Sequence, residues 1–180
     1  MGFAESSKAQ AVVSMEVTDG TLTSGDKKST YREDGEELLI TEVAADPGFA
    51  VIFTFSGIRV LSKYANQIRV NIVGWYEGAA NHDVQVHLWN YVTEAWESMT
   101  GNAKDLPDAA VPDNYQFAID VGDYMQVERF KAYVGYDREV KVRLYHDDTG
   151  NVLHDLHIDQ IYVDFPTLGT ERHRENLAHA

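Results

Sequence analysis

The stretch that decides the fold runs from residue 139 to 165 and reads EVKVRLYHDDTGNVLHDLHIDQIYVDF. Apolar residues occupy every second position in its first part: Val140, Val142 and Leu144. This alternation is typical of a half-buried β-strand, whose side chains point to opposite faces in turn. Turn-forming residues follow at 147–151, and the alternation resumes at Leu156 and Ile158. The stretch therefore predicts a β-hairpin centred on Gly150.

The hairpin interpretation also predicts which residues face one another. The apolar pairs are Leu144 with Leu156 and Val142 with Ile158, and the polar pairs are Lys141 with Asp159, Arg143 with His157, and Tyr145 with Asp155. Cross-strand energetics favour apolar partners on one face and opposite charges on the other. Beyond Ile158 the apolar positions change from even to odd. We therefore expect a β-bulge near residues 159–160.

A second hairpin is predicted over residues 68–91, with its turn at 77–81. Its apolar pairs would be Ile72 with Val86, Val70 with Leu88, and Gly74 with Val84. The opposite face would carry four side chains with binding chemistry, namely Trp75, Trp89, Tyr91 and, across from Trp89, Arg69.

The rest of the chain shows the same rhythm of short strands and turns. Further strands are predicted at 10–17, 38–43, 49–55, 115–119 and 130–134, a long loop at 101–114, and a turn across a sheet edge at 93–99, which contains Trp96. No helical period persists for three turns, and no βαβ alternation is visible. The pattern predicts an all-β fold, an antiparallel jelly-roll β-sandwich. The sandwich would span residues 10–166, between an N-terminal arm (1–9) and a C-terminal tail (167–180).

The composition indicates one acidic globular domain. A chain of 180 residues with 44% hydrophobic content can bury about 70% of its unfolded surface. The formal net charge of −14 would repel the phosphates of nucleic acids. The chain has no cysteine, no recognisable secretory signal and no apolar run near the ~20 residues of a membrane helix. We expect neither a nucleic acid nor a membrane as partner.

Three stretches resemble known jelly-roll proteins. VKVRLYHDDTGNVLHDLHIDQIYVDF resembles the closing strands of galactose-binding-like jelly rolls, the group that includes many carbohydrate-binding modules. VQVHLWNYVTEAWESM resembles the middle strand and tryptophan turn of that architecture, and DGEELLITEVAADPGFAVIFTFSGI is similar to the opening strands of jelly rolls among tailed-phage structural proteins. The resemblance covers roughly residues 20–165. It implies a binding or structural module, often a virion component.

The predicted aromatic face admits three interpretations. Trp75, Trp89 and Tyr91 would form a platform for sugar rings, whose apolar faces gain from packing on aromatic side chains. Arg69 with Trp89 would equally suit a protein–protein contact, because tryptophan, tyrosine and arginine are enriched at interfaces. The loop at 101–114 would alternatively cover these rings within the monomer.

Two places are candidates for a metal ion. His146 and His154 would face each other at the mouth of the final hairpin, where two imidazoles beside carboxylates suit zinc or another transition metal. The resemblance implies a structural calcium ion at Asp159, although pairing with Lys141 would also explain that carboxylate. His154 and His157 form an HxxH pattern, but positions i and i+3 of a strand point to opposite faces, so one metal would not bind both.

The sequence contains no recognisable catalytic motif. A nucleophile elbow, a phosphate-binding loop, a dinucleotide fingerprint and a zinc-protease motif are all missing. The resemblance, the arm and tail that flank the sandwich, and the aromatic face lead to the first hypothesis, a non-enzymatic structural component of a tailed-phage virion, such as a head-decoration, collar or tail-associated subunit. It would act through contacts with other virion proteins and with copies of itself. The alternative is a carbohydrate-binding module for attachment to a host surface or polysaccharide.

Overall fold

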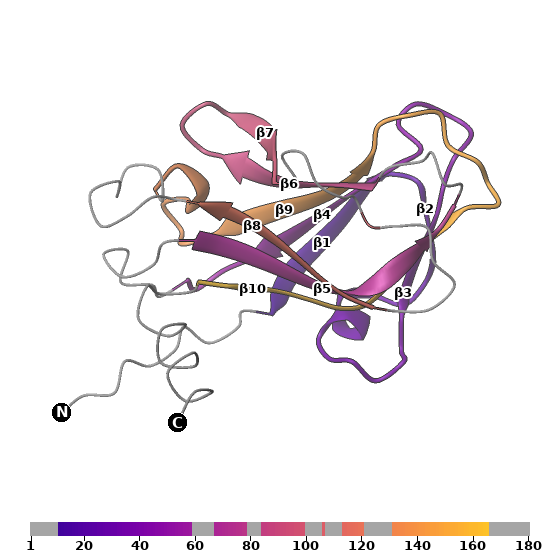
Figure 1. The fold of residues 1–180 in the computed structure, drawn as a ribbon, viewed down its shortest axis with the longest axis horizontal. Helices are drawn as coiled ribbons and strands as arrows, with labels where there is room; N and C mark the ends of the chain where they lie inside the picture. The colour runs from indigo at the N-terminus through magenta and orange to yellow at the C-terminus, as the bar shows by residue number, and fades with distance from the viewer. Residues whose placement is uncertain are drawn as a thin grey trace, which may run out of the picture.

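The computed structural model describes residues 11–58, 67–78, 84–99, 106, 113–120 and 131–165. They form two five-stranded antiparallel sheets that pack against each other (Figure 1). The first sheet contains, in spatial order, β1 (Val12–Asp19), β4 (Phe49–Phe55), β9 (Val140–His146), β6 (Val84–Asn90) and β7 (Ala95–Ser98). The second sheet contains β2 (Thr21–Ser24), β3 (Leu38–Thr41), β10 (Asp155–Asp164), β5 (Gln67–Glu77) and β8 (Asp113–Asp120). The predicted all-β jelly-roll sandwich is confirmed.

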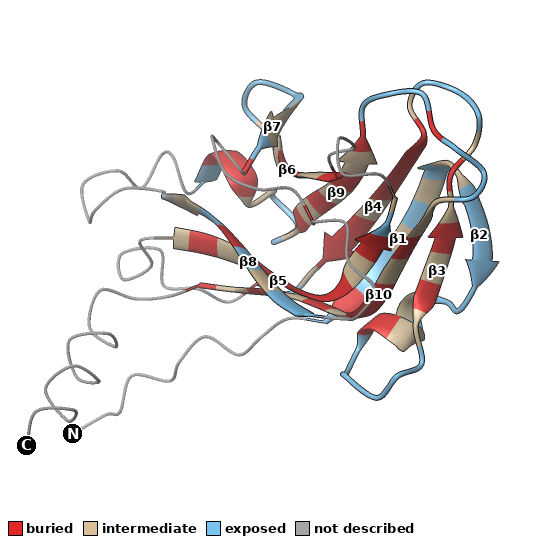
Figure 2. Cartoon of the chain, turned by 45° about the vertical axis from the view of Figure 1, so that its right-hand side comes forward, coloured by how far each residue is buried: buried red, intermediate tan, exposed pale blue. Residues whose placement is uncertain are grey.

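The core lies between the inner faces of the two sheets, as the buried stripes on the strands in Figure 2 show. Alternation sets these faces: β9 buries Val140, Val142 and Leu144, while β10 buries Leu156 and Ile158. The phenylalanines of β4 and Tyr76 of β5 are fully buried between the sheets. Burying one large apolar side chain stabilises a fold by about 1.5–3 kcal/mol, so this core is the main source of stability.

The predicted hairpin around Gly150 is wrong in its pairing. β9 lies between β4 and β6 in the first sheet, whereas β10 lies between β3 and β5 in the second. The polar partners differ accordingly: Lys141 lies opposite Thr54, Arg143 opposite Ile52 and His87, and Tyr145 opposite Ala50 and Gln85. The apolar residues of β9 and β10 therefore meet across the core and not side by side within one sheet.

The hairpin predicted over residues 68–91 fails for the same reason. β5 pairs with β10 and β8 in the second sheet, and β6 pairs with β9 and β7 in the first. Arg69 therefore lies opposite Ala118 and Asp164, and not opposite Trp89.

Several smaller predictions were also tested. The register of β10 against β5 shifts between Ile158 and Gln160, which confirms the predicted bulge. Residues 131–133 form a short helical turn, so the strand predicted at 130–134 is wrong. The predicted arm, tail and most of the loop at 101–114 lie outside the described residues. In the part of the chain that is described, no helix is long and apolar enough to cross a membrane.

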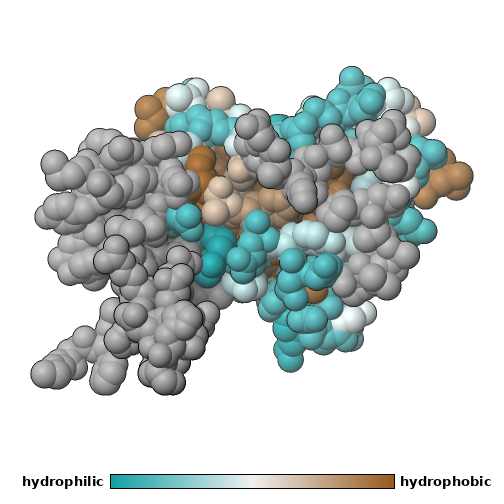
Figure 3. Space-filling model, viewed as in Figure 1, coloured by the Kyte–Doolittle hydropathy of each residue, from teal (hydrophilic) through white to brown (hydrophobic). Residues whose placement is uncertain are grey.

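A short 3-10 helix, η1 (Lys27–Thr30), lies in the connection between β2 and β3. The Asp26 side chain accepts a hydrogen bond from the backbone N–H of Lys28 at 2.6 Å, and the Ser29 hydroxyl accepts one from the N–H of Asp26. These bonds satisfy donors that the first turn leaves unpaired. Hydrophilic side chains cover this loop in Figure 3.

Candidate functional site

A groove of about 280 Å³ lies on the outer face of the first sheet. Its lining combines two aromatic rings with one acid, one base, hydroxyl groups and an aliphatic side chain: Trp89, Trp96, Glu16, Lys141, Ser14, Thr54 and Ile52. These residues come from β1, β4, β9, β6 and β7, so the groove crosses the whole sheet. On β4, β6 and β9 they occupy positions that alternate with buried core residues.

The hairpin between β6 and β7 brings the two tryptophans together. Trp89 lies directly opposite Trp96 in the strand register. The turn is fixed by Asn90, whose side chain accepts hydrogen bonds from the N–H groups of Val92 and Thr93 at 2.8 and 3.1 Å. Such local bonds let asparagine stabilise turns. The stretch that contains Trp96, for which a turn across a sheet edge is predicted, forms β7, the outermost strand of the sheet.

The tryptophan pair has a defined geometry. The ring centroids of Trp89 and Trp96 lie 5.2 Å apart with an interplanar angle of 67°, an edge-to-face arrangement. The Arg143 guanidinium lies 4.8 Å from the centroid of Trp96 and 4.2 Å from that of Tyr145. Edge-to-face and cation–π contacts are each worth about 0.5–1.5 kcal/mol. The aromatic rings are therefore held in place before any ligand binds.

A chain of hydrogen bonds continues from Arg143 along the sheet. Nε of Arg143 donates to Nδ1 of His87 at 3.1 Å, the His87 Nε2 atom lies 2.8 Å from Oε1 of Gln85, and Nε2 of Gln85 donates to Asp147 at 2.6 Å. Burial and the Arg143 charge lower the pKa of His87 from 6.5 to about 4, against an opposing effect of Asp147. The His87 ring is thus neutral at neutral pH, with Nδ1 as acceptor and Nε2–H as donor.

The residues predicted to form one aromatic face are distributed over the molecule. Trp75 and Arg69 lie on the outer face of the second sheet, where Trp75 stacks on His157 and Arg69 forms an ion pair with Asp164. Trp89 lies in the groove. Tyr91 follows β6, and its backbone N–H bonds to the carbonyl of Ala132 at 2.6 Å. Burial and the Glu139 and Asp137 charges raise its pKa to about 12.

The two histidines predicted to face each other as metal ligands at the mouth of the final hairpin both lie next to Glu42. Nδ1 of His146 lies 2.8 Å from Oε1 of Glu42, and Nδ1 of His154 lies 3.3 Å from Oε2. The Tyr76 hydroxyl and the Asn151 backbone N–H also donate to this carboxylate, whose side chain is fully buried. These partners satisfy the hydrogen bonds of the buried carboxylate. A metal ion at His146 and His154 stays a prediction. Glu42 was not predicted as a functional residue. The sequence does place it in the core, because it continues the alternation of the buried residues Leu38 and Ile40.

Asp159 is buried, but Lys141 is not its partner. Its Oδ1 atom accepts hydrogen bonds from the backbone N–H groups of Asp34 and Gly35 at 3.2 and 3.0 Å. The carboxylate thus fixes the loop that precedes β3. A calcium ion at Asp159 stays a prediction.

Comparisons with known proteins bear on the fold. No family model matches the chain, and no curated protein matches its sequence. Among solved structures, the chain is similar to the CBM22-1 xylan-binding domain of Paenibacillus barcinonensis Xyn10C, with 8% identity over 93% of this chain and 100% of that domain and a TM-score of 0.52. The chain has a jelly-roll fold like that of carbohydrate-binding modules.

Two further carbohydrate-binding modules are similar at lower scores. The CBM35 domain of Cellvibrio japonicus Abf62 is 15% identical over 88% of this chain and 89% of that chain, with a TM-score of 0.46. A CBM35 domain solved with a glucuronic-acid-containing disaccharide is 16% identical over 87% of this chain and 89% of that chain, with a TM-score of 0.47. The predicted role in a phage virion stays a prediction.

Proposed function

We propose that the protein is a carbohydrate-binding module that binds a neutral polysaccharide in the groove of the first sheet. The observation that carries the proposal is the convergence of Trp89 and Trp96 with Glu16 and Lys141 in one groove. Indole rings pack against the apolar C–H face of a sugar. The carboxylate accepts hydrogen bonds from sugar hydroxyls, and the ammonium group donates to them.

The size of the groove supports contact with a short segment of a chain. Its volume of about 280 Å³ lies at the lower limit of ligand pockets, which span roughly 300–1,000 Å³. The groove crosses every strand of the sheet, which suits an extended polymer better than an enclosed small molecule. We expect affinities in the micromolar to millimolar range, about −4 to −8 kcal/mol.

Charge favours a neutral ligand. The net charge of −14 opposes the approach of polyanions at low salt. Inside the groove, Glu16 and Lys141 supply opposite charges, so the lining itself has no excess of positive charge with which to hold an anionic chain. Xylan is the first ligand to test, because the xylan-binding domain shares the fold, although a shared fold alone does not define a ligand.

Affinity electrophoresis in gels that contain neutral polysaccharides tests the proposal. The wild-type protein should be retarded by at least one of xylan, β-glucan, mannan and cellulose derivatives, while a Trp89→Ala/Trp96→Ala double variant should migrate freely. Trp75→Ala is the matched control, because it removes the same side chain from the other sheet. No retardation of the wild type by any of these polymers, or equal retardation of the double variant, would contradict the proposal.

A further inference from the structure

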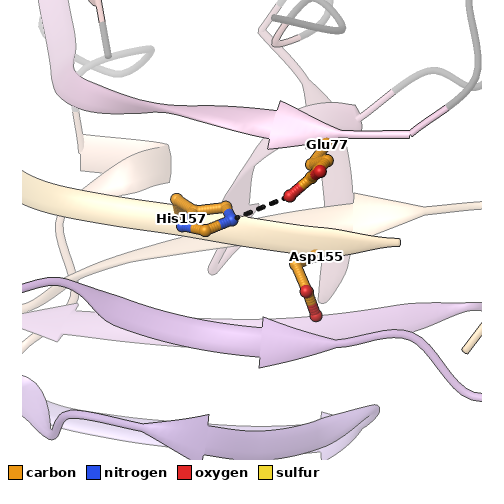
Figure 4. A group of neighbouring side chains, drawn as sticks. All are labelled: Glu77, Asp155 and His157. Carbon is orange, nitrogen blue, oxygen red and sulfur yellow. Dashed lines mark ion pairs between the residues drawn. The ribbon is translucent and has the colours of Figure 1, made fainter. Parts of the chain in front are cut away.

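The outer face of the second sheet carries a separate group of potential metal ligands: Glu77, Asp155 and His157. One ligand atom from each side chain lies within 4.8 Å of the other two. Figure 4 shows the edge of the His157 ring turned toward Glu77 on the neighbouring strand. These are an imidazole and two carboxylates, which is the ligand chemistry of zinc and related divalent ions.

The strand geometry explains why these side chains meet. Asp155 and His157 are two residues apart on β10, so their side chains leave the same face of the sheet. Glu77 on β5 lies directly opposite Asp155 in the antiparallel register. Directly opposed residues have Cβ atoms about 4.5–5.5 Å apart, which places their functional groups within reach of one ion.

The partners of His157 orient the ring for coordination through Nε2. Nδ1 lies 3.0 Å from Oε2 of Glu37. Glu37 can accept the Nδ1–H, and in the neutral ring this leaves the lone pair on Nε2. The Nε2 atom is buried, makes no hydrogen bond, and lies 3.6 Å from Oε2 of Glu77. Two ligand atoms ~2.1 Å from one tetrahedral ion lie about 3.4 Å apart. The observed separation is close to that value.

Contacts hold Asp155 and His157 in place, and none of the described cations offsets the acidic charge of the group. The Thr41 hydroxyl donates to Oδ1 of Asp155 at 2.6 Å, and the Trp75 ring stacks on His157 with centroids 4.0 Å apart. Among the described residues, no lysine or arginine pairs with Glu37, Glu77 or Asp155. Three carboxylates around one imidazole favour a bound cation.

We propose that Glu77, Asp155 and His157 bind a divalent transition-metal ion, with zinc as the reference ion, and that Glu37 and Thr41 position two of these ligands. Three protein ligands leave a coordination position for water. The site would join β5 to β10, and through Glu37 and Thr41 also to the edge of β3. It is separate from the groove, so it does not depend on the proposed glycan binding.

Calorimetric titration of the tag-free full chain with zinc chloride tests the site. One zinc ion should bind per chain, and both His157→Gln and Glu77→Gln should weaken binding by at least about tenfold, the scale of losing an ordering group or ligand. Glu36→Gln is the matched control, because Glu36 is exposed in the same loop as Glu37 and the change removes the same charge. The zinc affinity of Glu36→Gln should equal that of the wild type.

Glu77→Gln keeps the test decisive if His157→Gln folds poorly, because the Glu77 side chain is 66% exposed. A second readout is the quenching of Trp75 fluorescence by copper chloride, which Trp75→Phe should abolish. Absence of zinc binding by the wild type would overturn the proposal. Unchanged zinc binding by Glu77→Gln and His157→Gln, or full displacement of zinc by equimolar calcium, would also overturn it.

Discussion

The two outer faces of the sandwich use the same residue types in different ways. On the first sheet, Arg143 contacts aromatic rings and a neutral histidine. On the second, Arg69 donates to both carboxylate oxygens of Asp164 through Nε and Nη2, and Asn71 also bonds to that carboxylate at 3.0 Å. Within the described part of the chain, a carboxylate pairs with Arg69 but none pairs with Arg143.

The tryptophans of the two faces also differ in how far neighbouring groups cover their rings. Trp75 is stacked on His157 with an interplanar angle of 11°, so one of its faces is already covered. Trp89 and Trp96 meet edge to face and line an open groove. The contacts that a side chain already makes, more than its residue type, decide which face offers a binding surface.

The largest expected effect is a loss of stability when Glu42, in the core between the two sheets, is replaced. Replacing Glu42 by alanine removes the acceptor for the Tyr76 hydroxyl and the carboxylate that both His146 and His154 contact. Loss of one partner from a buried charged network costs about 3–5 kcal/mol. Urea unfolding should show this loss, whereas the exposed control Glu36→Ala should change stability by less than about 0.5 kcal/mol. Equal stability of the two variants would refute a structural role for Glu42.

The comparison of the two arginines predicts opposite phenotypes. Arg143→Lys should weaken glycan binding about fivefold and change stability little, because lysine loses the planar stacking on Trp96 and Tyr145. Arg69→Lys should leave glycan binding unchanged and lower the free energy of unfolding by about 1 kcal/mol, because the bidentate bond to Asp164 is lost. Titration calorimetry and urea unfolding of both variants measure the two effects. Exchanged phenotypes would place the binding surface on the second sheet.

A smaller effect is expected from pH, which should change the stability of the protein through His87 on the first sheet. The pKa of His87 falls from 6.5 in the unfolded chain to about 4 in the folded protein. Between these values the unfolded state binds more protons, so stability should fall as the pH decreases from about 6.5 to about 4. His87→Gln should show a shallower decrease over this range in urea unfolding. An identical pH dependence would show that His87 is not buried as a neutral ring.

The alternation of apolar residues predicted much of the fold. It located β4, β5, β6, β9 and β10, and the change of parity predicted the bulge in β10. Alternation states which side chains point inward, but not to which sheet a strand belongs. Leu144 and Leu156 satisfy the pattern equally well as neighbours in one sheet or as partners across the core.

The candidate site was predictable only in part for the same reason. Trp89 was identified, but the hairpin prediction grouped it with Trp75, which lies on the other sheet. Trp96, Glu16 and Lys141 join Trp89 only through the pairing of β1, β4, β9, β6 and β7. β6 and β7 are consecutive and form a hairpin, but β1, β4 and β9 are distant from them in sequence, so no local pattern indicates that Glu16 and Lys141 meet the tryptophans.

The central claim is that the groove of the first sheet, and not the second sheet, binds a neutral glycan. Titration calorimetry with the polysaccharide that retards the wild type most strongly, applied to Trp89→Ala, Trp96→Ala and Trp75→Ala, tests it most directly. Each groove variant should weaken binding at least about thirtyfold, as expected for loss of a central tryptophan, while Trp75→Ala should remain within about twofold of the wild type. A loss in Trp75→Ala that equals the loss in Trp89→Ala, or unchanged binding in both groove variants, would contradict the account.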